Sequence, residues 1–112
     1  MFKYKVEILI DEEKVITDKV YNPETMYEYI KDMFRQYHLK EVETDKPNHI
    51  VFTDVGTDKD MAGLALAAID LYDMEWFKKY AVKCLWISRN RDGSISESSV
   101  FDELKDFVVK GI

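Results

Sequence analysis

Residues 2–10, FKYKVEILI, carry the clearest strand signal in the chain, because apolar and polar side chains alternate along them. A period of two places alternate side chains on the same face of a strand. The next apolar segment, VITDKVY at residues 15–21, is short and β-branched and follows the polar loop DEEK. The sequence therefore predicts that the two segments pair as an antiparallel hairpin.

A helix is predicted to begin at Asn22, because this residue is a good N-cap and Pro23 suits the first helical position. Apolar side chains then recur at helical spacing, at Met26, Ile30, Met33, Phe34 and Tyr37. Such a stripe is typical of a helix that packs on a core.

Three further segments carry strand signals. A weak one at residues 39–43 and a stronger one at residues 50–54 flank the polar turn TDKPN, which indicates a second hairpin. Residues 80–90, YAVKCLWISRN, are almost continuously apolar, so we expect a central strand covered on both faces. After the turn NRDGS, residues 100–111 are predicted to form a final amphipathic helix, with Ser99 and Asp102 as a capping box.

The order of these segments predicts an α+β fold. The order, roughly ββα(β)βαβα, favours a two-layer sandwich with a four- or five-stranded, mixed or mainly antiparallel sheet and about three helices. A chain of 112 residues can form one core, and folding at that size buries roughly 65% of the surface of the unfolded chain. No repeat or linker composition is visible, so residues 1–112 are expected to form a single globular domain.

The composition describes an acidic chain. Hydrophobic residues make up 46% of it, and 22 acidic against 16 basic residues give a net charge of -6. This balance argues against direct binding of nucleic acid or anionic membranes, which attract basic patches. Charges interrupt the first apolar residues, unlike in a signal peptide, and no segment approaches the ~20 apolar residues of a membrane span. We expect a cytoplasmic protein that binds a protein partner or itself.

The stretch TDVGTDKD at residues 53–60 crowds three aspartates and raises the question of a bound ion. An EF-hand loop opening at Asp58 fails, because Ile69 occupies the position that requires a bidentate glutamate. A P-loop fails as well, because no lysine follows the second glycine of this region. The residues fit a helix start better, with Thr57 as N-cap and Asp60 completing a capping box. We therefore expect neither a metal nor a cofactor.

The helix behind that start has an unusual composition, because every residue from Met61 to Ile69 is apolar or glycine. Small side chains permit close approach to a neighbour, and apolar character all round indicates burial on more than one side. The second covering is either the core of the chain or another copy of it. The aromatic residues that follow, Tyr72, Trp76 and Phe77, are the predicted interaction surface, because such residues are enriched in interface cores.

No catalytic residue can be nominated from the sequence. His38 and His49 belong to no ligand or nucleophile motif, and the serines lack a GxSxG elbow. The best ligand candidate is the loop after the predicted central strand, where Arg89, Arg91 and Ser96 precede a predicted helix amino terminus. Guanidinium groups and free helix amides together favour a carboxylate or phosphate ligand.

Three hypotheses of function follow from these observations. The first is a non-catalytic protein-interaction or self-associating module, with a homodimer as one form. The second is a small-molecule binding protein or enzyme that uses the arginine-containing loop for an anionic ligand. The third is an acidic inhibitor that occupies the nucleic-acid groove of a binding protein, which the modest net charge supports only in part.

Overall fold

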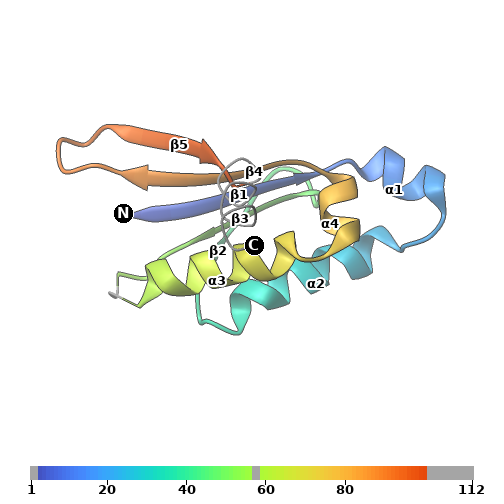
Figure 1. Cartoon of the computed structure of the whole chain (residues 1–112), viewed down its shortest axis with the longest axis horizontal. Helices are drawn as coiled ribbons and strands as arrows, with labels where there is room; N and C mark the ends of the chain where they lie inside the picture. The colour runs from blue at the N-terminus through green and yellow to red at the C-terminus, as the bar shows by residue number, and fades with distance from the viewer. Residues whose placement is uncertain (1–2, 57–58, 101–112) are drawn as a thin grey trace, which may run out of the picture.

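The computed structural model describes residues 3–56 and 59–100, which form a five-stranded antiparallel sheet with helices packed on one face (Figure 1). The predicted α+β architecture is confirmed, and the described strands all pair antiparallel. In chain order the elements are β1 (Tyr4–Ile10), α1 (Glu12–Asp18), α2 (Pro23–Arg35), β2 (Lys40–Val42), β3 (His49–Thr53), α3 (Asp60–Tyr72), α4 (Glu75–Tyr80), β4 (Ala81–Arg89) and β5 (Ile95–Ser99).

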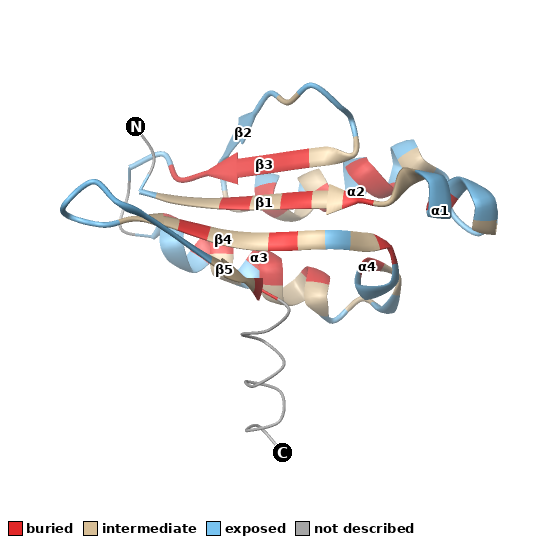
Figure 2. Cartoon of the chain, turned by 90° about the horizontal axis from the view of Figure 1, so that it is seen from above, coloured by how far each residue is buried: buried red, intermediate tan, exposed pale blue. Residues whose placement is uncertain are grey.

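β1 is the middle strand of the sheet, whose order is β2-β3-β1-β4-β5. Its alternating sequence directs Val6, Ile8 and Ile10 into the core, where none is more than 1% exposed. Figure 2 views the sheet from its other face, with α2 and α3 behind it. We call this helix-free side the outer sheet face.

The strand predicted at residues 80–90 is confirmed as β4, which lies inside the sheet but not at its middle. Among the described residues, helices cover β4 on one face only, whereas cover of both faces was expected (Figure 2). Ile87 on the outer sheet face is nevertheless buried, and the residues opposite it on the neighbouring strands are Lys5 and Glu97.

The predictions for α2 and the second hairpin are confirmed. Asn22 caps α2 through its Oδ1 atom, which accepts a hydrogen bond from the Thr25 amide at 3.1 Å. α2 packs on the sheet through Phe34, whose ring stacks on that of Phe52 with the centroids 4.8 Å apart. β2 pairs with β3, with Val42 opposite Val51, so the weak strand signal at residues 39–43 does mark a strand.

Residues 15–21 do not form the predicted strand, because residues 12–18 form α1 instead. Asp11 caps this helix, accepting a hydrogen bond from the Lys14 amide at 3.1 Å. Val15 is fully buried, and Asp18 accepts a hydrogen bond from the Tyr80 hydroxyl at 2.9 Å. These tertiary contacts outweigh the modest strand preference of a β-branched sequence.

The prediction that Ser96 lies in a loop before the final helix is wrong, because residues 95–99 form β5. The Asp92–Gly93 turn reverses the chain, with Gly93 at φ 88, and β5 then pairs with the free edge of β4. The final helix predicted at residues 100–111 lies outside the described residues beyond Val100.

Candidate interaction surface

α3 buries one side and presents an apolar side to solvent. The buried side packs toward the sheet and α2, and consists of Asp60, Gly63, Leu64, Ala67, Ala68 and Leu71. At 100° per residue, the opposite side of the helix carries a second set. This set, here called the α3 outer face, is Met61, Ala62, Ala65, Leu66, Ile69 and Tyr72.

The α3 outer face is apolar along its whole length. Met61 and Leu66 are each 47% exposed, Ala62 is exposed, and the other three residues are half-buried. The only charged residues within the helix are Asp60, which is buried, and Asp70, which lies beside this face. A helix side that faces water ordinarily carries polar or charged residues. The predicted apolar character all round therefore corresponds to a surface that the described residues cover only in part.

The inner side of α3 is pressed closely against the end of α2. A Cβ atom at Gly63 would lie only 3.0 Å from the Cβ of Tyr37. The small residues of this helix thus divide between two sides: Gly63 and Ala67 pack inward, whereas Ala62 and Ala65 face outward. Close packing within the chain explains the first pair and leaves the second pair unexplained.

The buried aspartates that flank the loop before α3 bind backbone amides. Asp54 Oδ1 accepts hydrogen bonds from the amides of Lys3 at 2.7 Å and Tyr4 at 3.1 Å. Asp60 Oδ2 accepts one from the Val55 amide at 2.6 Å. Within residues 3–56 and 59–100, no group of three His, Cys, Asp or Glu side chains could hold a metal ion.

The start of α3 differs from the predicted capping box. The helix begins at Asp60 with Lys59 as its N-cap, so Asp60 is the first helical residue and not the third. Its carboxylate still satisfies an amide that precedes the helix, which is the electrostatic role expected of an acid in the first turn. Thr57, the predicted N-cap, lies outside the described residues.

The aromatic residues predicted as an interaction surface occupy three different settings. Phe77 is 0% exposed and belongs to the core, so its assignment to a surface is corrected. Tyr72 lies on the α3 outer face, where the Lys78 Nζ atom is 5.1 Å from its ring centroid. Trp76 lines a groove between α2, α4 and the loop before α2.

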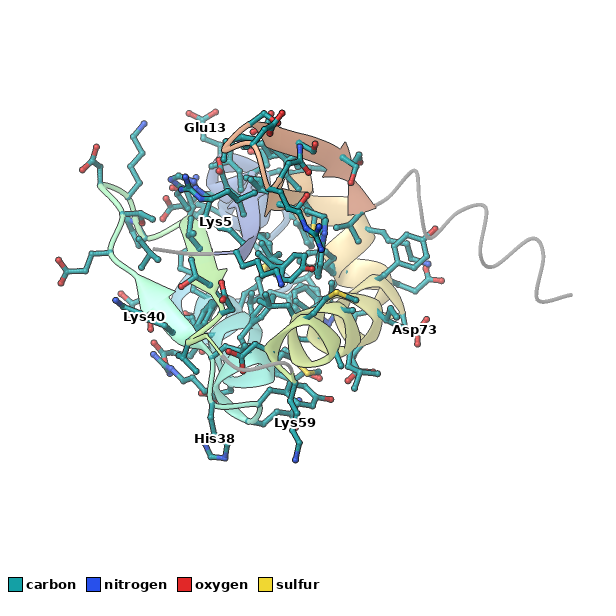
Figure 3. All side chains as sticks on the ribbon, turned by 90° about the vertical axis from the view of Figure 1, so that its left-hand side faces the viewer. Lys5, Glu13, His38, Lys40, Lys59 and Asp73 are labelled. Carbon is teal, nitrogen blue, oxygen red and sulfur yellow. The ribbon has the colours of Figure 1, made fainter. Side chains whose placement is uncertain are left out.

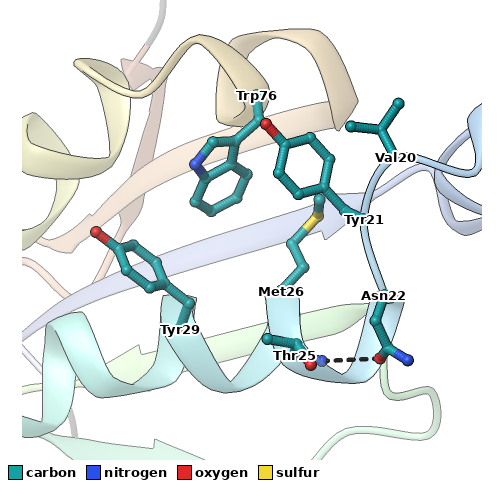
Figure 4. Close-up of a pocket in the computed structure, with 7 residues that line it drawn as sticks. All are labelled: Val20, Tyr21, Asn22, Thr25, Met26, Tyr29 and Trp76. Carbon is teal, nitrogen blue, oxygen red and sulfur yellow. Dashed lines mark hydrogen bonds between the residues drawn. The ribbon is translucent and has the colours of Figure 1, made fainter.

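Figure 4 shows this aromatic groove, which has a volume of ≈ 260 Å³ and is lined by Val20, Tyr21, Asn22, Thr25, Met26, Tyr29 and Trp76. Tyr29 meets Trp76 edge to face, with centroids 5.5 Å apart, and Tyr21 is tilted against it at 6.2 Å. The groove offers room for an apolar group. Sequence reasoning missed it because Val20 and Tyr21 are predicted to lie in a strand, although Tyr21 and Tyr29, close together in the sequence, were a usable signal.

The structure does not assemble the predicted anion site. Arg89 is opposite Ile95 and Ser88 is opposite Ser96, so alternation sends the Arg89 and Ser96 side chains to opposite faces of the β4–β5 hairpin. Ser96 instead accepts a hydrogen bond from Asn90 at 3.0 Å. Arg91 is exposed in the turn. The premise of an adjacent helix amino terminus also fails, because β5 intervenes.

The outer sheet face carries a small charged cluster. Glu7 Oε1 lies 2.9 Å from Lys83 Nζ and 3.1 Å from His49 Nε2. The hydrogen bond from Lys83 holds the pKa of the Glu7 carboxyl below its usual value, against the effect of partial burial. The other histidine, His38, is exposed beyond α2 in the left-handed region at φ 60. Both histidines therefore have strand-end or surface positions.

Comparisons with known protein families, with curated proteins and with solved structures find no match to this chain. None of the described helices is long and apolar enough to cross a membrane. The fold and the surface define a small α+β domain whose most unusual described feature is the apolar outward side of α3.

Proposed function

We propose that this chain is a non-catalytic protein-interaction module that binds another polypeptide through the α3 outer face. One observation carries the proposal: the solvent side of a 13-residue helix is apolar throughout, with Met61 and Leu66 each 47% exposed. A contiguous exposed apolar patch is typical of a protein interface. An exposed apolar patch lowers the solubility of a protein, and the net charge of -6 acts in the opposite direction.

The energetics favour docking of moderate strength. Full burial of a large aliphatic side chain contributes about 1.5–3 kcal/mol, and Met61, Leu66 and Ile69 still expose part of their surface. Association costs several kcal/mol in lost translational and rotational freedom. The α3 outer face therefore supports a reversible interaction, whose extent depends on the concentration of the partner, more than a permanent one.

Site-specific photo-cross-linking tests the proposal in cells that naturally produce the chain. A benzophenone amino acid replaces Leu66 in one variant and Ile95 in the control, because these side chains are 47% and 48% exposed. We expect a discrete polypeptide adduct from position 66 and only background from position 95. Adding Ile69→Glu should remove the adduct, because a charge then replaces an apolar contact. Equal background at the two positions would contradict the proposed function.

A further inference from the structure

We propose that the polypeptide bound by the α3 outer face is a second copy of this chain, with the two α3 helices antiparallel across a two-fold axis near Ala65 and Leu66. The inference rests on the proposed function and names its partner. It is drawn from the charges at the two ends of the face and from the sizes of the side chains between them.

The charges at the ends of α3 are complementary when the helices run antiparallel. Lys59 is the N-cap and Asp73 is the C-cap, and both are exposed (Figure 3). An antiparallel pair brings Lys59 beside Asp73 of the partner subunit, and the symmetry repeats this contact at the other end. A parallel pair would instead place like charges together. The midpoint between the two charges is residue 66, so the two-fold axis lies close to Leu66, near the centre of the apolar face.

The side chains near that axis alternate in size in a way that suits self-pairing. With the axis between Ala65 and Leu66, Ala62 faces Ile69 of the partner subunit, and Ala65 faces Leu66 of the partner subunit. Leu66 and Ile69 thus each meet an alanine, which allows ridges to enter grooves at a short interhelical distance. This arrangement gives a packing partner to Ala62 and Ala65, neither of which is among the buried residues of α3.

The size of the face predicts a reversible dimer. A helix of 13 residues is about 20 Å long, which is short of what a standard interface of about 800 Å² per partner requires. Two acidic chains also repel each other at long range, although about 0.15 M salt largely screens that repulsion. We therefore expect monomer and dimer to exchange at micromolar concentrations.

Sedimentation velocity of the purified full chain tests the stoichiometry, across about 1 µM to 1 mM, which brackets the dissociation constants of modest interfaces. We expect a concentration-dependent dimer. Leu66→Glu should raise its dissociation constant about tenfold or more, because the axis brings two buried carboxylates together. Ile95→Glu, at a side chain of equal exposure on β5, should leave it unchanged. A dimer that Leu66→Glu does not weaken would overturn the inference and show that another surface is used.

Charge exchange tests the antiparallel orientation. Lys59→Glu alone and Asp73→Lys alone should each weaken the dimer several-fold, because each creates two repulsive pairs across the interface. The double variant Lys59→Glu/Asp73→Lys should restore the original dissociation constant. Absence of rescue would overturn the proposed orientation.

Engineered cysteines identify what covers the face. Burial raises the pKa of the native Cys84 thiol to about 12, which leaves it unreactive toward alkylating reagents. Ala65→Cys should form a disulfide between two copies under mild oxidation, whereas Ile95→Cys should not. Rapid alkylation of Ala65→Cys in a chain that stays monomeric at the highest concentration would overturn the second-copy inference. The photo-cross-linked adduct would then identify a different polypeptide, and the proposed function would stand.

Protection of Ala65→Cys in a monomer would overturn both proposals, because it would mean that the chain covers its own α3 through residues outside the described ranges.

Discussion

At the scale of single residues, Asp54 connects two strands through a side chain and not through the sheet ladder. It follows β3, is buried, and accepts hydrogen bonds from the amides of Lys3 and Tyr4 at 2.7 and 3.1 Å. Asp54→Ala leaves both amides without an acceptor, and a charge-assisted bond contributes more than a neutral one. We expect the free energy of unfolding to fall by about 2–3 kcal/mol in urea titrations followed by circular dichroism.

Asp54→Asn provides the matched control, because the amide oxygen can still accept while the charge is removed. The free energy of unfolding of Asp54→Asn should fall by about 1 kcal/mol, close to the difference between charged and neutral hydrogen bonds. Equal losses for the two variants would mean that packing, and not hydrogen bonding, accounts for the effect of Asp54.

At the scale of elements, the sequence predicts helices and strands well where local pattern and tertiary contacts agree. Alternation in β1 and the Asn22–Pro23 start of α2 are examples. α1 was mispredicted because its β-branched residues favour a strand, whereas burial of Val15 favours a helix. The Asp11 cap and the two glutamates after it are the helix signal that this segment carries in its sequence.

β5 shows a second limit of local patterns. Its sequence, ISESS, is polar, and the segment becomes a strand because it can pair with the edge of β4. The dipeptide Asp92–Gly93 was a hairpin signal. The predicted anion site of Arg89, Arg91 and Ser96 depends on a loop in place of β5, and it fails because the strand forms. The apolar nature of α3 was visible in the sequence, but which of its residues face water depends on how Gly63 seats the helix.

The end of α1 yields a prediction at this scale. Lys19 adopts the left-handed conformation at φ 56 and ψ 25, which costs an L residue about 1–2 kcal/mol. Lys19→Gly removes that strain but raises the entropy of the unfolded chain by an equivalent of about 0.5–1 kcal/mol. We expect a net stabilisation of about 0.5–1 kcal/mol, measured by urea unfolding. Lys14→Gly, inside the same helix, should instead destabilise by about 1 kcal/mol, and stabilisation of both variants would contradict the assignment of Lys19 as the cap.

At the scale of the whole molecule, titrating groups limit the pH range in which the fold is most stable. The pKa of Glu7 is lowered in the folded chain, chiefly by the hydrogen bond from Lys83. The unfolded chain therefore binds more protons than the folded chain near and below the ordinary glutamate value of 4.5, and stability is lost as the pH falls through that region. Glu7→Gln should flatten this part of the stability curve.

At alkaline pH the stability of the fold falls as the pH rises, and the first group responsible is the buried thiol of Cys84. Burial raises the pKa of Cys84 from its ordinary value of 9.0 to about 12, so above pH 9.0 the unfolded chain releases a proton that the folded chain retains. Stability then falls as the pH rises, by about 1.4 kcal/mol per pH unit from this group.

Chemical denaturation between pH 7 and 10 should show that fall of stability in the wild type, and Cys84→Ala should not show it. The smaller alanine side chain lowers stability by the same amount at every pH. Tyr27, with a pKa raised to about 12 by burial and by the charge of Glu12, adds a slope only above its ordinary value of 10.0. Tyr27→Phe is therefore the control that should leave the interval from pH 9 to 10 unchanged. The same slope in the wild type and Cys84→Ala would show that the thiol can ionise within the fold, which requires water to reach the interior at β4.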